Sequence, residues 1–154
     1  MSVTLQPVTA ENWRELITLK VRDDQSHFVA SNVHSIAEAQ FGFDDEGHWN
    51  SFPFGIYAGE IPVGFLMYAT NPAHSRIQVF IMRLMVDEKY QGKGYGREAM
   101  KLVLDDFRTN EKVRSVAISY SPENVGAKML YAALGFVENG EKAGEEDLAV
   151  LNLH

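Results

Sequence analysis

Residues 83–96 read RLMVDEKYQGKGYG, in which an apolar run is followed by a glycine-rich loop. The composition of residues 76–86 is typical of a strand, and residues 97–108 place apolar side chains at helical spacing. Glycines between a strand and a helix let the backbone approach a ligand closely. The N–H groups of the first helical turn, together with the helix dipole, attract an anion. The stretch therefore predicts a strand, an anion-binding loop and a helix. A diphosphate is the natural ligand, with Lys93 adding a positive charge.

Three other interpretations of the loop compete with an anion site. A glycine loop between strand and helix can be a tight turn and nothing more. A Walker loop is disfavoured because no GxxxxGK followed by Ser or Thr is present. A dinucleotide fingerprint is disfavoured because Gly92, Gly94 and Gly96 follow G-x-G-x-G spacing, and the next strand ends in Ser-Tyr-Ser instead of an acidic residue. These residues alone do not exclude the interpretation as a tight turn.

A second informative block is NVGAKMLYAALGF, residues 124–136. It predicts a helix that ends at Gly135, a residue type that favours helix C-termini. Asn124 and Tyr131 are about two helical turns apart, so they share one face and can line one ligand. Asn124 could instead only cap the helix, and Tyr131 could be a core tyrosine.

Strands and helices alternate along the rest of the chain, which favours a mixed α/β sheet and a single domain over residues 1–154. The pattern predicts one helix from Thr9 to Lys20 and a short second helix in which Ser35 starts a capping box. Residues 41–54 look irregular. Strands are predicted at residues 3–8, 54–58, 63–69, 76–86, 113–119, 136–137 and 148–153.

Composition excludes several classes of function. The chain has no cysteine, so disulfides, thiolate metal sites and a cysteine nucleophile are ruled out. Its five histidines form no HExxH or HxH pair, and we expect no metal. The net charge of −7 disfavours nucleic acid and is compatible with a cationic small molecule. We expect no membrane segment and, without a leader pattern, a cytoplasmic protein.

Together the two blocks resemble the GNAT superfamily of acyl-CoA N-acyltransferases. The loop is similar to the family motif Arg/Gln-x-x-Gly-x-Gly/Ala through Gln91, Gly94 and Gly96, and the helix is similar to N-x-x-A-x-x-L-Y-x-x-x-G-F at every named position. The resemblance implies an α/β fold with a central, mostly antiparallel sheet flanked by helices, whose fourth and fifth strands are splayed. By family habit it also implies a homodimer.

The resemblance further implies acetyl-CoA as co-substrate and direct attack by an amine within a ternary complex. Backbone near Val86 would polarise the thioester carbonyl, and Tyr131 would protonate the departing thiolate. The absence of cysteine argues against an acetyl-cysteine intermediate. The residues implied in co-substrate binding are Leu84, Met85, Val86, Gln91, Gly92, Lys93, Gly94, Tyr95, Gly96, Asn124, Ala127 and Tyr131.

The acceptor is predicted from residues 19–41, 53–68 and 83–96, which resemble bacterial spermidine/spermine and diamine acetyltransferases. An acidic, aromatic-walled site would suit such a long cation. Equally, the aromatics could be core residues and the acids surface residues. The residues predicted to bind the acceptor are Asp23, Asp24, His27 and Phe28, with Glu38, Phe41 and Trp49 as further members.

The general base is not identified by the sequence. In some polyamine relatives an acidic residue precedes the position of Arg83, whereas this chain has Met82 there. The alternatives to a small-amine acetyltransferase are a protein lysine or N-terminal acetyltransferase and a non-enzymatic acyl-CoA-binding module. The candidate bases are Asp23, Asp24, His27, Glu46 and His48.

Overall fold

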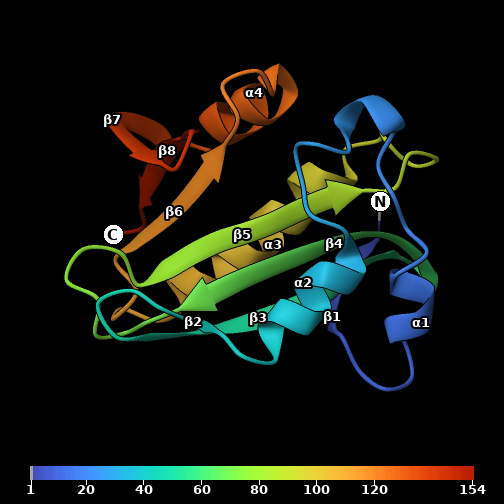
Figure 1. The fold of residues 1–154 in the computed structure, drawn as a ribbon, viewed down its shortest axis with the longest axis horizontal. Coiled ribbons are helices and arrows are strands. Elements are labelled where there is room, and N and C mark those ends of the chain that lie inside the picture. The colour runs from blue at the N-terminus through green and yellow to red at the C-terminus, as the bar shows by residue number, and fades with distance from the viewer. Residues whose placement is uncertain (1) are drawn as a thin grey trace.

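A computed structural model describes residues 2–154, in which the strands join into one mixed sheet flanked by helices (Figure 1). In chain order the elements are β1 (Val3–Pro7), α1 (Trp13–Leu16), the 3₁₀ turn η1 (Asp23–Gln25), α2 (Asn32–Ala39), β2 (Phe43–Asp44), β3 (His48–Ala58), β4 (Ile61–Thr70), β5 (Val79–Val86), α3 (Tyr95–Arg108), β6 (Ser115–Tyr120), α4 (Val125–Ala133), β7 (Val137–Ala143) and β8 (Glu146–Asn152).

Neighbouring strands are antiparallel except for one pair, which confirms the predicted fold class. The strand order is β1-β3-β4-β5-β6-β8-β7, and the short β2 pairs with β3. Strands β5 and β6 run parallel and pair only where Val79–Ile81 faces Val116–Ile118. Beyond that point β5 continues to Val86 and β6 to Tyr120, and the two strands diverge (Figure 1). They are the strands predicted to be splayed, the fourth and fifth, and they are β5 and β6 here because the structure has the additional strand β2 before them.

A bulge in β5 lies where the strands separate. Met67 of β4 pairs with Arg83 and Tyr68 pairs with Ile81, so Met82 is an extra residue between them. Such a bulge bends its strand and increases the local twist. As a result the side chains of Met82 and Arg83 both lie on the face of the sheet that carries α2. There Arg83 Nε donates to Ser35 Oγ at 3.2 Å. The bulge therefore turns the end of β5 away from β6.

Each face of the sheet has its own core. Helix α3 covers one face, where Met100, Val103, Leu104 and Phe107 are buried as their helical spacing predicts. Helices α1 and α2 cover the opposite face, over a smaller cluster that includes Phe65, Met67 and Met85 (Figure 1). Because strand residues alternate between faces, β4 contributes to both cores and carries few exposed residues.

The two early helices differ from their predictions. The helix expected from Thr9 to Lys20 is limited to the four residues of α1, with turns on both sides. The capping-box prediction at Ser35 is wrong, because the helix begins earlier and Ser31 is its N-cap, accepting a bond from the His34 N–H. Ser35 lies inside α2, where its buried hydroxyl donates to the Ser31 carbonyl. No helix within residues 2–154 is long and apolar enough to cross a membrane.

Strand β3 begins at His48, six positions earlier than predicted, so part of the segment expected to be irregular is strand. Its first half, which mixes polar and aromatic residues, pairs with the end of β4, from Asn50 opposite Thr70 onward. This pairing depends on a distant strand, and local composition therefore conceals it. Helix α3 likewise begins at Tyr95, inside the glycine loop, two residues before the predicted start.

Candidate active site

A cavity of about 790 Å³ opens between the diverging ends of β5 and β6. Its walls come from five parts of the chain that are far apart in sequence. These are the segment from η1 to α2, the end of β5 with the glycine loop, the end of β6, helix α4 with its N-cap, and Glu146 at the start of β8. Both blocks identified in the sequence therefore face one space.

The glycine loop leaves the N-terminus of α3 open toward this cavity. Gly94 is the N-cap in a left-handed conformation (φ 83°), and as a glycine it makes no side-chain cap hydrogen bond. A Cβ placed on Gly92 would meet nothing within 4 Å, and one on Gly96 would meet only Val86 Cγ2 at 3.6 Å. Free N–H groups and the helix dipole make such an end attractive to an anion. Lys93 lies in the loop without lining the cavity.

Gln91 fixes the loop against two other elements. Its side-chain amide donates to the Val86 carbonyl and to Gln25 Oε1, both at 2.9 Å. Its own oxygen accepts from Arg22 Nη1 at 2.9 Å. The loop, the end of β5 and the η1 segment are therefore held in one arrangement by a single side chain.

The end of β5 presents an unpaired backbone edge to the cavity. Leu84, Met85 and Val86 line the space, and on their other side they pair with β4 through Gly64–Leu66. Within residues 2–154 the edge toward β6 has no strand partner there, because the β5–β6 pairing stops at Ile81. Unpaired N–H and C=O groups along a strand can bind an extended ligand as an added strand would.

Helix α4 brings Asn124 and Tyr131 to the same cavity, as their spacing predicts. Asn124 does cap the helix, since its Oδ1 accepts from the Ala127 N–H at 3.2 Å, and it also lines the cavity with Ala127. The Tyr131 ring is buried between Tyr120 and Phe136. Its hydroxyl has no hydrogen-bond partner within residues 2–154 and is not sealed from the cavity.

The environment of Tyr131 favours the protonated hydroxyl. Burial, and then the nearby charge of Glu146, raise the pKa of Tyr131 above its usual value of 10.0. The phenol therefore keeps its proton at neutral pH. Tyr131 therefore has both of the roles that the sequence offered as alternatives, since its ring is part of the core and its hydroxyl faces the cavity.

The predicted acceptor residues are only partly assembled. His27 and Phe28 line the cavity, with ring centroids 4.0 Å apart. Asp23 and Asp24 lie in η1 outside the lining, where Asp24 accepts from Arg22 Nε at 3.2 Å.

The further members of the predicted acidic and aromatic site lie elsewhere. Glu38 bonds Arg83 Nη2 at 2.7 Å and does not line the cavity. Phe41 is 80% exposed, and Trp49 is buried against His74. These side chains therefore form no common wall with His27 and Phe28.

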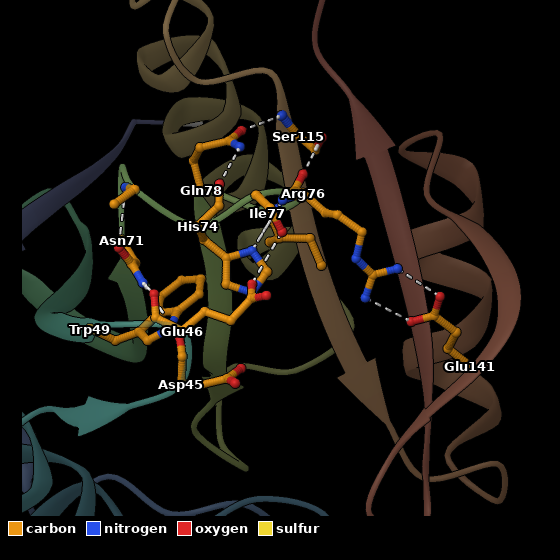
Figure 2. Close-up of polar contacts among 12 residues, drawn as sticks. Asp45, Glu46, Trp49, Asn71, His74, Arg76, Ile77, Gln78, Ser115 and Glu141 are labelled. Atoms are coloured by element: carbon orange, nitrogen blue, oxygen red, sulfur yellow. Dashed lines mark hydrogen bonds and ion pairs between the residues drawn. The ribbon is translucent and has the colours of Figure 1, made fainter.

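Two candidate bases, Glu46 and His48, lie outside the cavity lining. Glu46 accepts from His74 Nε2 at 2.7 Å, while His74 Nδ1 accepts from the backbone N–H groups of Arg76 and Ile77 (Figure 2). Both ring nitrogens are thus engaged in holding the turn between β4 and β5. His48 is exposed and bonds a neighbouring carboxylate.

Sequence reasoning missed Ser119 and Glu146. Glu146 is the only acidic residue among those lining the cavity in the described chain, and its carboxylate accepts from Ser119 Oγ at 2.8 Å. It appeared in the sequence as part of an acidic turn near the end of the chain. Its place depends on β8 lying between β6 and β7, which no local pattern signals.

Comparisons with known proteins agree with this geometry. The model of the acetyltransferase (GNAT) family matches residues 12–136. The chain is 30% identical over 145 residues to a spermine/spermidine N(1)-acetyltransferase of Bacillus subtilis, a match that covers 92% of this chain and 91% of the relative.

Solved structures show the same fold. A spermidine N-acetyltransferase from Vibrio cholerae in complex with CoA and spermine superposes with a TM-score of 0.72 at 18% identity, over 98% of this chain and 95% of that one. An aminoglycoside acetyltransferase in complex with coenzyme A gives 0.73 at 15% identity, over 98% and 95% of the two chains. The resemblance seen in the two sequence blocks is confirmed. The chain belongs to the acetyltransferase (GNAT) family and is an N-acetyltransferase.

Proposed function

We propose that this chain transfers the acetyl group of acetyl-CoA to a primary amine of a small, polyamine-like acceptor such as spermidine, spermine or a diamine. One observation carries the proposal. A single cavity joins an anion-attracting helix end, an unpaired strand edge and a protonated tyrosine hydroxyl. These three features match the diphosphate, the amide-containing arm and the leaving sulfur of acetyl-CoA.

The parts of the co-substrate are assigned accordingly. The diphosphate binds at the loop of Gln91, Gly92, Lys93, Gly94, Tyr95 and Gly96, where backbone N–H groups and the helix dipole offset its charge. The pantetheine arm pairs with the unpaired edge at Leu84–Val86. Asn124 and Ala127 line the same space on α4, and with them Tyr131.

The chemistry is direct transfer within a ternary complex. The amine nitrogen attacks the thioester carbon, whose oxygen is polarised by backbone N–H near Val86. The C–S bond breaks, and Tyr131 gives its proton to the sulfur. The chain contains no cysteine to form a thioester intermediate of its own. Residues 1–154 act as one catalytic domain in this proposal, because every group named lies within them.

The polyamine acceptor is supported by two observations. A relative that carries the name spermine/spermidine N(1)-acetyltransferase covers 92% of this chain at 30% identity. The cavity itself offers aromatic and acidic groups, Phe28 and Glu146, that suit a cation.

The test is release of CoA from acetyl-CoA by the purified protein, with spermidine, spermine, putrescine, single amino acids and a lysine peptide as acceptors. We expect turnover with the polyamines, and mass spectrometry should show one added acetyl group. Turnover with the peptide alone would make the chain a protein acetyltransferase. Bound CoA without turnover on any acceptor would favour an acyl-CoA-binding module and contradict the proposal.

A further inference from the structure

The proposed reaction needs a group that accepts a proton from the acceptor amine, because a primary amine is largely protonated at neutral pH. Of the five candidate bases predicted from the sequence, only His27 lines the cavity. The position before Arg83 holds Met82, which cannot accept a proton. The base must therefore be sought among the residues that the fold brings to the cavity.

The side chain of Glu146 is directed to the face of the sheet opposite α3. Val116, Ile118 and Tyr120 of β6 belong to the core on the α3 side, so alternation places Ser119 on the other face. The Glu146 carboxylate accepts from Ser119 Oγ at 2.8 Å and therefore lies on that face as well. It is half-buried and lines the cavity.

His27 and Phe28 approach the cavity from that same face. They lie between Val21 and Val29, which pack on the core cluster beneath α1 and α2. Tyr131 belongs to the opposite core, on the side of α3 and α4. The cavity thus passes through the gap between β5 and β6, with a carboxylate on one side and the proton donor on the other.

We propose that Glu146 binds the protonated amine of the acceptor and takes its proton, with Ser119 holding the carboxylate in position. This inference rests on the amine acetyltransferase activity proposed above. The ammonium nitrogen loses two of its three protons in forming the amide. One passes to Glu146 and then to solvent. Tyr131 gives its proton to the thiolate, and the second proton leaves the nitrogen after attack and reprotonates Tyr131 through solvent. The tyrosine is thereby restored, and one proton is released overall.

Two other ionisable groups that line the cavity are engaged in hydrogen bonds. Arg83 bonds Glu38 at 2.7 Å, and Tyr120 donates to Glu138 at 2.7 Å. On the strands beside Glu146, Asp147 is paired with Lys142, and Glu145 is exposed. The remaining titratable side chains that line the cavity are His27, Tyr90, Tyr95 and Tyr131.

An ammonium at Glu146 has a second consequence. The charge of Glu146 contributes, after burial, to the raised pKa of Tyr131. A bound cation would offset that charge and lower the pKa of Tyr131 toward the range in which it gives up its proton. Acceptor binding and readiness of the proton donor would thereby be coupled through one carboxylate.

The test compares Glu146→Gln with Glu145→Gln, which removes the same charge from the exposed neighbouring residue. Glutamine keeps the shape and the acceptor oxygen for Ser119, so folding and CoA affinity should be unchanged. With spermidine we expect kcat/KM to fall about a hundredfold near pH 7 for Glu146→Gln, the usual effect of losing a general base. The deficit should shrink as pH rises and free amine accumulates. Glu145→Gln should behave as wild type.

Two results would overturn the inference. One is a Glu146→Gln enzyme whose kcat/KM equals that of wild type at every pH, especially if His27→Gln shows the loss instead. The other is a deficit that is constant with pH, which indicates a structural role. If the wild type acetylates an amine other than a polyamine, the same comparison on that amine tests Glu146 while the polyamine proposal alone fails.

Discussion

A negative charge at Gly96 should separate stability from CoA binding. Gly96 lies in the first turn of α3 and lines the cavity, and an added Cβ would meet only Val86 Cγ2 at 3.6 Å, an ordinary contact. A larger side chain therefore has room to extend toward the proposed diphosphate site. Gly96→Glu places a carboxylate where we expect two phosphate groups.

The two effects have opposite signs. Replacing a helical glycine gains up to about 1 kcal/mol, and an acidic side chain at a helix N-terminus adds about 0.3–1 kcal/mol. Because Gly96 lies in the first helical turn, only part of this stabilisation applies. We therefore expect the unliganded variant to melt roughly 2–4 °C higher than wild type. Against this, a carboxylate about 6 Å from one phosphate charge costs about 3 kcal/mol at an effective dielectric constant of about 20.

Two phosphates double that cost, and solvent screening reduces it by a similar factor. A net penalty of about 3 kcal/mol weakens CoA binding about a hundredfold. Thermal unfolding without CoA and calorimetric titration with CoA measure the two quantities. Gly96→Gln controls for side-chain volume, and Gly96→Ala, which the family motif admits, should retain binding. A stable Gly96→Glu protein that binds CoA as tightly as wild type would refute the diphosphate assignment.

Three further predictions follow from the site and the core. Tyr131→Phe should lose most of its turnover while keeping CoA affinity, because the ring stays packed and only the proton donor is removed; equal losses of both would contradict the assignment. Since the pKa of Tyr131 is raised above 10.0, the donor stays protonated across the neutral and mildly alkaline range. A pH–rate profile should therefore show no alkaline decline due to this residue below about pH 10. Leu16→Ala should destabilise the protein by about 2–5 kcal/mol in urea unfolding, because Leu16 is fully buried, and a loss under 1 kcal/mol would contradict its core role.

The strand, glycine loop and helix from residue 79 to residue 108 were predictable because local signals agree there. The apolar run, the glycines and the helical spacing all indicate the same elements, and in the structure the strand begins three residues after its predicted start and the helix two residues before. The block at residues 124–136 was equally informative, since Asn124 and Tyr131 both reach the cavity. In both blocks the functional residues are close neighbours in sequence.

The acceptor side was not predictable in the same way. Asp23 and Asp24 precede His27 in a polar segment, and nothing in that segment tells which side chains turn toward the cavity. The structure places His27 there and leaves the two aspartates outside the lining. Glu146 reaches the cavity only through the pairing of β8 with β6, a contact between residues that are distant in sequence. The position of Glu146 on the acceptor side of the cavity therefore depends on tertiary pairing.

In the proposed reaction, acetyl-CoA and the amine meet in one cavity and the acetyl group passes directly between them. Initial rates measured over a grid of acetyl-CoA and spermidine concentrations test it most directly. Direct transfer predicts double-reciprocal lines that intersect, because both substrates must be bound before any product leaves. Parallel lines, together with CoA release in the absence of amine and an acetylated protein in the mass spectrum, would show a covalent intermediate and contradict direct transfer.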